Sequence, residues 1–233
     1  MNGHLLLEGG AEFSGRMADP DRRAVALAGG RDAPLCIIPT AAAPDHNDQH
    51  AGYNGERWFR NLGVKHITVL PLVDVDSANN PSLAVVIQKS QFIYLLGGFP
   101  RYLGETLAGS LCGQAMLEAW RQAGALVGGS SAGAMVLCEH FYDPETGSIL
   151  QGLNYIPGAC IIPHHNTFGR RWAPRLAELL PEDVLIGIDE QTGLLDDGPE
   201  GGWTVYGKGV VTLYRKGVPA VFHPGELNHA LVV

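Results

Sequence analysis

Short apolar runs separated by longer helical stretches constrain the fold of this chain more than any other feature of its sequence. Each run is almost continuously apolar, and this pattern is typical of a strand that is covered on both faces. Repeated strand–helix–strand units build a parallel sheet with helices packed on it. The predicted strands are 35–38, 66–70, 92–96 and 125–127, and the predicted helices are 55–62, 81–90 and 102–123.

After Met135 the pattern changes, and Gly-rich turns separate the apolar segments. Such spacing is typical of antiparallel strands. We therefore expect an α/β fold with one sheet, parallel in its first half and extended by antiparallel strands. A length of 233 residues fits a single domain over residues 1–233. The later segments are a turn at 143–147, an apolar run at 159–163, a helix at 176–180 and strands at 184–188, 203–206 and 210–214.

Residues 125–137 combine a strand, a sharp glycine-rich turn and a helix, with Ser131 at the apex of the turn. In this context a Gly-x-Ser-x-Gly motif holds a nucleophilic serine, and its neighbours, here Gly129 and Gly133, must be small because the backbone is strained. The turn also directs the N–H group of Ala132 toward a developing oxyanion. The alternatives are a turn used for close packing or a phosphate-binding turn. The phosphate interpretation is weaker because neither a lysine nor a G-x-G-x-x-G pattern follows.

A serine nucleophile needs a base, which is commonly a histidine oriented by a carboxylate. His164 and His165 directly follow an apolar run that ends at Pro163, so either imidazole can reach a site at the sheet edge. Asp189 and Glu190 follow the next apolar run in the same way. The residues alone leave open which histidine and which acid take part.

Composition excludes several other classes of function. The formal net charge is −8 and no basic tract is present, so general affinity for nucleic acid or anionic membranes is not expected. The N-terminus lacks the features of a signal peptide, and we expect a cytoplasmic protein. No metal or organic cofactor is suggested. Cysteine spacing indicates neither a zinc site nor a disulfide framework, only buried thiols at Cys36, Cys112, Cys138 and Cys160.

Three separated segments resemble the S51 serine peptidases, the family that includes dipeptidase E and cyanophycinase. They are the elbow Gly129-Ser130-Ser131-Ala132-Gly133-Ala134, the segment Pro163-His164-His165 and the stretch Gly187-Ile188-Asp189-Glu190-Gln191-Thr192. Their order and separations fit the family. The resemblance implies the three-layer, flavodoxin-like fold of class I glutamine amidotransferases, in which helices flank a mostly parallel sheet, here with added antiparallel strands in the C-terminal part.

The same resemblance implies a role for individual residues. Ser131 corresponds to the nucleophile, His164 to the general base and Glu190 to the orienting acid. The N–H groups of Gly98 and Ala132 correspond to the oxyanion donors. His165 then occupies the position of an aromatic residue in the family pattern.

The chain departs from its relatives at the segment expected to line the substrate cleft. Phe99-Pro100-Arg101 stands where relatives often carry a polar pair. We expect substrate contacts from five side chains: Phe99, Arg101, His165, Arg170 and Arg171. The arginines could supply a guanidinium fork for a substrate carboxylate.

These features lead to the hypothesis of a serine peptidase that forms an acyl-enzyme with small peptides and prefers acidic, Asp or isoaspartyl-type residues at the scissile bond. One alternative is a cyanophycinase-like hydrolase of branched Asp-Arg peptides. Another is a glutamine amidotransferase-type domain, although that chemistry needs a cysteine where Ser131 stands. A non-catalytic binding module would predict a damaged triad. The expected partner is a small peptide substrate, and a homodimer is left open.

Overall fold

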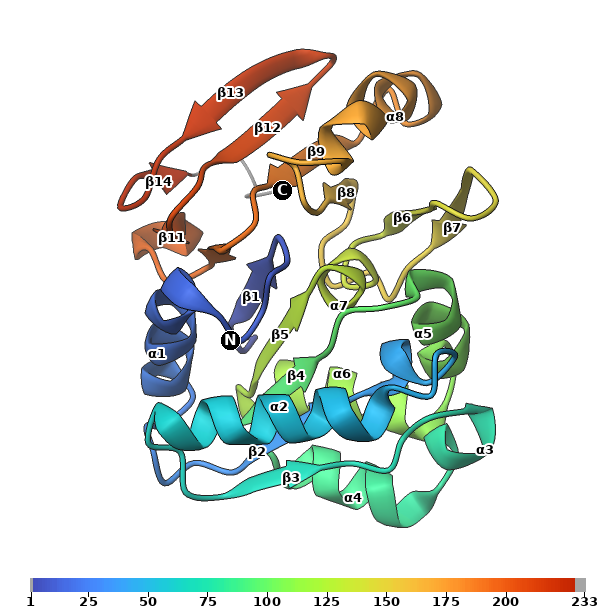
Figure 1. The fold of residues 1–233 in the computed structure, drawn as a ribbon, viewed down its shortest axis with the longest axis vertical. Coiled ribbons are helices and arrows are strands. Elements are labelled where there is room, and N and C mark those ends of the chain that lie inside the picture. Colours follow the sequence, from blue (N-terminus) through green and yellow to red (C-terminus); the bar gives the residue numbers. More distant parts are fainter. Residues whose placement is uncertain (1, 229–233) are drawn as a thin grey trace.

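The computed structural model describes residues 2–228, and within them an eight-stranded sheet forms the centre of the molecule (Figure 1). Its order is β14-β11-β10-β1-β5-β4-β2-β3. Strands β1 to β5 run parallel to one another, whereas β10, β11 and β14 are antiparallel to their neighbours. The eight strands are β1 (Leu5–Glu8), β2 (Leu35–Ile38), β3 (Ile67–Val69), β4 (Phe92–Leu95), β5 (Leu126–Ser130), β10 (Thr192–Leu195), β11 (Trp203–Gly207) and β14 (Leu227–Asn228).

Helices cover both faces of this sheet, which confirms the predicted three-layer α/β fold. In Figure 1, α2 passes in front of the sheet and α6 lies behind it. Alternating strand residues explain the arrangement: Leu6 and Tyr94 pack toward α1 and α2, while Leu7 and Leu95 pack toward the opposite helices. The helices are α1 (Ala18–Leu27), α2 (Asp48–Asn61), α3 (Val75–Ala78), α4 (Pro81–Lys89), α5 (Pro100–Leu107), α6 (Leu111–Ala123) and α7 (Ala132–Met135). Short 3-10 helices lie at η1 (Gly15–Met17), η2 (Thr40–Ala42), η3 (Gly169–Trp172) and η4 (Pro199–Gly201).

The C-terminal part forms a second sheet, so the expectation of one sheet is wrong. Strands β8 (Ala159–Ile162), β9 (Val184–Ile188), β12 (Val211–Arg215) and β13 (Val218–Phe222) pair in the order β13-β12-β9-β8, and α8 (Ala173–Leu179) connects β8 to β9. Between β9 and β10 only three residues transfer the chain from one sheet to the other, and Gln191 there has a φ of 55°. Apolar runs predict strands but do not indicate which sheet each strand joins.

The predicted helix 102–123 is two helices, because Ser110 caps a new one. Its hydroxyl accepts a hydrogen bond from the Gly113 N–H at 3.0 Å, and Gly109 just before it has a φ of 68°. The residues that follow Asp143 form the predicted turn, inside a hairpin of β6 (His140–Asp143) and β7 (Ser148–Gln151). Five elements of the central layers were not predicted: the strands β1, β10 and β14 and the helices α1 and α3.

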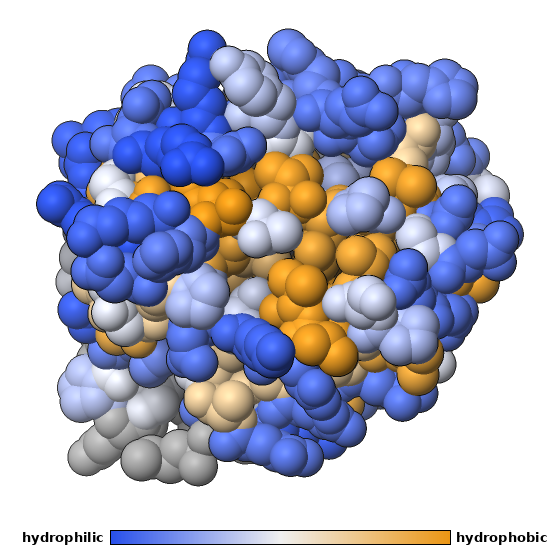
Figure 2. Space-filling model, turned by 90° about the horizontal axis from the view of Figure 1, so that it is seen from below, coloured by the Kyte–Doolittle hydropathy of each residue, from blue (hydrophilic) through white to orange (hydrophobic). Residues whose placement is uncertain are grey.

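One end of the molecule exposes apolar side chains. Figure 2, viewed from the side on which β3, α3 and α4 lie in Figure 1, shows a central apolar area surrounded by polar residues. Val75 and Val85 are exposed on α3 and α4. All four cysteines are buried and unpaired. Among the described helices, none is long and apolar enough to cross a membrane.

Candidate active site

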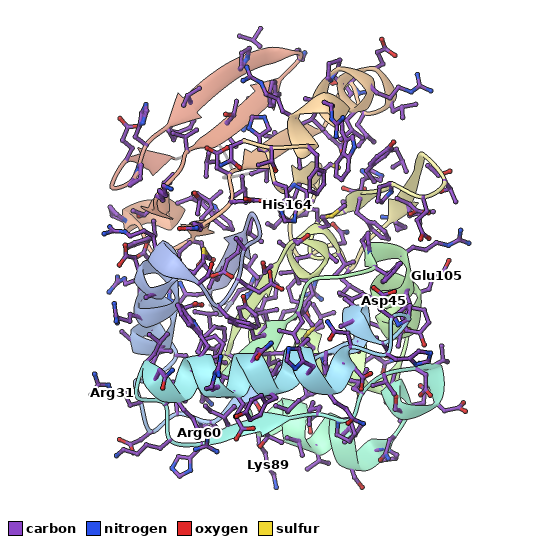
Figure 3. All side chains as sticks on the ribbon, viewed as in Figure 1. Arg31, Asp45, Arg60, Lys89, Glu105 and His164 are labelled. Carbon is purple, nitrogen blue, oxygen red and sulfur yellow. The ribbon has the colours of Figure 1, made fainter. Side chains whose placement is uncertain are left out.

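The three residues implied as a triad come together at the carboxyl ends of one strand of the central sheet and two strands of the second sheet. Ser131 directly follows β5, His164 follows β8 and Glu190 follows β9. Figure 3 shows His164 above the end of β1, between the central sheet and the second sheet. The backbone supports this placement, because the Ser131 N–H donates to the carbonyl oxygen of Glu8 at 3.0 Å.

The side chains form a continuous hydrogen-bonded series. The Oγ atom of Ser131 lies 3.1 Å from Nε2 of His164, and Nδ1 of His164 lies 2.8 Å from Oε1 of Glu190. With a proton on Nδ1 donated to Glu190, Nε2 is free to accept the serine proton. Phe168 stacks on the imidazole at a centroid distance of 4.7 Å, and the Thr167 hydroxyl donates to Glu190 Oε1 at 3.4 Å. These contacts fix the ring in one orientation.

The backbone at the site is strained. Ser131 has a φ of 49° and His164 a φ of 50°, values that non-glycine residues rarely adopt. The elbow also leaves no room for larger neighbours. A Cβ atom on Gly133 would lie 2.2 Å from the carbonyl oxygen of Leu95, and one on Gly129 would lie 2.5 Å from the carbonyl carbon of Gly133. The turn therefore needs glycine at both positions.

Two backbone N–H groups beside Ser131 have no acceptor among residues 2–228. They belong to Gly98, after β4, and to Ala132, after β5. Gly98 has a φ of 140°, and a Cβ atom there would lie 2.1 Å from the carbonyl oxygen of Ala41. Unpaired donors of this kind are able to stabilise an oxyanion.

Phe99 and Arg101 line a cavity of about 550 Å³ that begins at Gly98. Arg101 is already engaged there: its Nε donates to Glu105 at 2.8 Å, and a terminal nitrogen lies 4.0 Å from Asp143. Other lining residues are Pro44, Pro100, Tyr102, Pro144 and Glu145.

The other three expected substrate residues lie elsewhere. His165 is buried against the second sheet, where its Nε2 lies 2.8 Å from the Tyr214 hydroxyl. Arg170 lines a separate cavity with His165, and Arg171 donates through Nε to the carbonyl oxygen of Phe168 at 3.3 Å. The structure therefore does not bring these three side chains to the cavity beside Gly98.

Sequence reasoning missed a group of acids beneath the site. Glu8 is fully buried, and its Oε2 accepts a hydrogen bond from the Tyr94 hydroxyl at 2.5 Å. Asp21 is also fully buried and accepts from Trp58 Nε1 at 2.7 Å. The one signal of this buried group in the sequence is Glu8, an acid at the end of the apolar run of β1.

These two buried carboxyls lie close together, and each affects the pKa of the other. Burial, followed by the nearby carboxylate of Asp21, raises the pKa of Glu8 well above its usual range. Burial likewise raises the pKa of Asp21 to about 7. Glu8 Oε1 and Asp21 Oδ1 have no donor among the described residues apart from each other's carboxyl. A proton on Glu8, donated to Asp21, satisfies both atoms.

Comparisons with known proteins place this chain among peptidases of one family. The family model described as "Peptidase family S51" matches residues 5–200. A cyanophycinase from Geminocystis herdmanii (strain PCC 6308) is 30% identical over 228 residues, covering 90% of this chain and 79% of that protein. The crystal structure of a peptidase from an acI-B1 Actinobacterium matches with a TM-score of 0.86 and 30% identity, over 97% of this chain and 96% of that one. A putative peptidase E protein from Listeria monocytogenes EGD-e has a TM-score of 0.67 at 17% identity, over 89% and 100% of the two chains, and shares the fold.

Proposed function

This chain belongs to peptidase family S51, and from that premise we propose that it hydrolyses short peptides through an acyl-enzyme on Ser131. The observation that carries the proposal is the hydrogen-bonded series from Ser131 through His164 to Glu190, with distances of 3.1 Å and 2.8 Å. Both distances are within the reach needed for proton transfer and for orientation of the base.

In the first half of the reaction, Ser131 Oγ attacks the carbonyl carbon of the scissile bond and His164 Nε2 takes the hydroxyl proton. The carbonyl electrons move to oxygen, and the free N–H groups of Gly98 and Ala132 are the donors for that oxyanion. Glu190 stabilises the imidazolium. As the intermediate collapses, the C–N bond breaks, His164 gives its proton to the leaving amine, and the acyl group remains as an ester on Ser131.

The second half repeats these steps with water. His164 takes a proton from the water molecule, whose oxygen attacks the ester carbonyl at the same oxyanion position. When the C–O bond to Ser131 breaks, the serine oxygen recovers the proton from His164 and the acid product leaves.

The preference for acidic residues at the scissile bond is the finer part of the proposal. Its support is Arg101, whose guanidinium lines the cavity that begins at Gly98. A second candidate, hydrolysis of branched Asp-Arg peptides, is favoured by the opposite charge in the same cavity. There the carboxylates of Glu105, Asp143 and Glu145 outnumber the one guanidinium, and such a lining suits a cationic substrate group.

A peptide panel tests the function and separates the two specificities. Wild type is assayed with Asp-X, isoaspartyl and Arg-branched peptides, beside Ser131→Ala, His164→Ala and the matched control His165→Ala. We expect cleavage by wild type and His165→Ala but not by the first two variants. Arg101→Met should raise KM for acidic peptides under the first specificity, whereas Glu145→Gln should raise KM for Arg-branched peptides under the second. Equal cleavage by His164→Ala and His165→Ala would contradict the assigned base.

A further inference from the structure

Glu12 lies in the loop after β1, and its carboxylate connects two turns that carry the reacting groups. Its Oε2 accepts a hydrogen bond from the Ser130 hydroxyl at 2.8 Å, and its Oε1 accepts one from the Gly97 N–H at 3.4 Å. Gly97 directly precedes Gly98, whose N–H group is the first oxyanion donor, and Ser130 directly precedes the nucleophile.

The carboxylate of Glu12 and the side chain of Ser131 both lie close to Gly97. A Cβ atom on Gly97 would lie 2.9 Å from Glu12 Oε1 and 3.4 Å from the Cβ of Ser131. One small residue therefore separates the two side chains.

Glu12 has no ion-pair partner within 4.0 Å in the described part of the chain. The two groups that donate hydrogen bonds to Glu12 are neutral, so these hydrogen bonds depend on the positions of its carboxylate oxygens. A negative charge this close to a developing oxyanion opposes catalysis, and this favours a geometric use of the side chain.

We propose that Glu12 is a positioning residue, which holds the turn of Gly97 and Gly98 at a fixed distance from the serine elbow. This inference rests on the proposed function. Glu12 acts through Gly97 and Ser130. Losing it allows the oxyanion donor and the nucleophile to move apart, and a displacement of about 1 Å is enough to cost on the order of 100-fold in rate.

Glutamine can replace Glu12 in this role. Its amide oxygen accepts from the Gly97 N–H, and its amide nitrogen donates to the Ser130 hydroxyl, which turns to accept. A positioning role therefore predicts that Glu12→Gln retains activity and Glu12→Ala does not.

The test measures kcat and KM with the peptide best cleaved by wild type, together with urea unfolding of every variant. The variants are Glu12→Gln, Glu12→Ala, Ser130→Ala, the double alanine variant and the exposed control Glu118→Gln. For Glu12→Ala we expect kcat to fall roughly 30- to 100-fold with KM within about threefold. Glu12→Gln should stay within about threefold of wild type in kcat, and the double variant should be little slower than Glu12→Ala alone.

Three results would overturn the inference: wild-type kcat in Glu12→Ala, losses in the double variant that multiply, or a loss in Glu12→Gln as large as in Glu12→Ala. The last result would mean that the charge itself matters, as in recognition of a substrate ammonium group. Failure of the proposed function is distinguishable, because wild type would then cleave no peptide in the panel. Unfolding curves that match wild type show that a loss of kcat does not come from a loss of fold.

Discussion

The buried carboxyl pair of Glu8 and Asp21 predicts that stability falls as pH rises, and that Glu8→Gln removes the part of this dependence that comes from Glu8. In the unfolded chain Asp21 loses its proton near its ordinary pKa of 3.8, whereas in the folded protein its pKa is raised to about 7. Between these values the folded state binds more protons than the unfolded state, so the free energy of unfolding decreases with rising pH. The raised pKa of Glu8 acts in the same direction.

The magnitude follows from the shift. Each pH unit well between the two pKa values costs about 1.4 kcal/mol, and the slope falls to half of this at the folded pKa, so Asp21 alone lowers the free energy of unfolding by about 2 kcal/mol between pH 5 and pH 7. In Glu8→Gln the side-chain amide oxygen accepts from Tyr94, and the amide nitrogen donates to Asp21. Position 8 then no longer titrates, so the contribution of Glu8 disappears, while burial still raises the pKa of Asp21. We expect the decrease over the same range to become smaller than in wild type by about 2 kcal/mol.

Urea unfolding at pH 5, 6, 7 and 8, followed by tryptophan fluorescence at constant ionic strength, measures this difference. Glu178→Gln is the matched control, because that carboxylate is exposed and paired only with Arg175. The control should parallel wild type. Groups such as His4, whose pKa is raised by its hydrogen bond to Asp196, contribute equally to all three proteins. Parallel pH dependence in wild type and Glu8→Gln would refute the reasoning.

Two further predictions concern the triad and the elbow. In Glu190→Gln the amide still reaches His164 Nδ1 but does not carry the charge that stabilises the imidazolium. We therefore expect kcat to fall by about 100-fold or more while KM changes little. Steady-state kinetics at pH 7 measure this, and an unchanged kcat would remove Glu190 from the mechanism. In Gly133→Ala the added methyl group would lie 2.2 Å from the carbonyl oxygen of Leu95, so we expect the melting temperature to fall by several degrees and peptide hydrolysis to be lost. Gly109→Ala is the control for space, because its Cβ would meet no atom within 4 Å and its φ of 68° adds only backbone strain; this variant should lose some stability but keep peptide hydrolysis. Loss of hydrolysis in both variants would contradict the packing argument.

Local patterns in the sequence predicted much of the central sheet. Four of its five parallel strands were predicted from almost continuous apolar runs; β2, β4 and β5 are buried, whereas β3 at the edge of the sheet is partly exposed. The fifth, β1, was missed because its run of three leucines is short and ends at Glu8. That glutamate is tolerated in the interior because Tyr94 and Asp21, distant in sequence, surround it. No periodic pattern in the sequence indicates that Glu8 contacts Tyr94 and Asp21.

In the candidate site, too, some residues could be predicted from the sequence and others could not. Ser131, His164 and Glu190 each follow an apolar run, so strand ends indicated where reacting groups collect. Adjacent residues could not be separated in this way. His164 faces Ser131 and His165 faces Tyr214, because His164 adopts a left-handed backbone conformation that directs the two rings to opposite sides. Glu12 carried no signal, since its partners come from the end of β5 and from the turn after β4.

Labelling by a fluorophosphonate probe tests the central claim, nucleophilic attack by Ser131, most directly. Intact-protein mass spectrometry should show one adduct on wild type, peptide mapping should place it on Ser131, and Ser131→Ala should remain unlabelled. Labelling should slow strongly in His164→Ala and remain near the wild-type rate in His165→Ala, because the Ser131 hydroxyl is hydrogen-bonded to His164 Nε2, whereas His165 Nε2 faces Tyr214. Unlabelled wild type, or Ser131→Ala labelled to the same extent as wild type, would contradict the account.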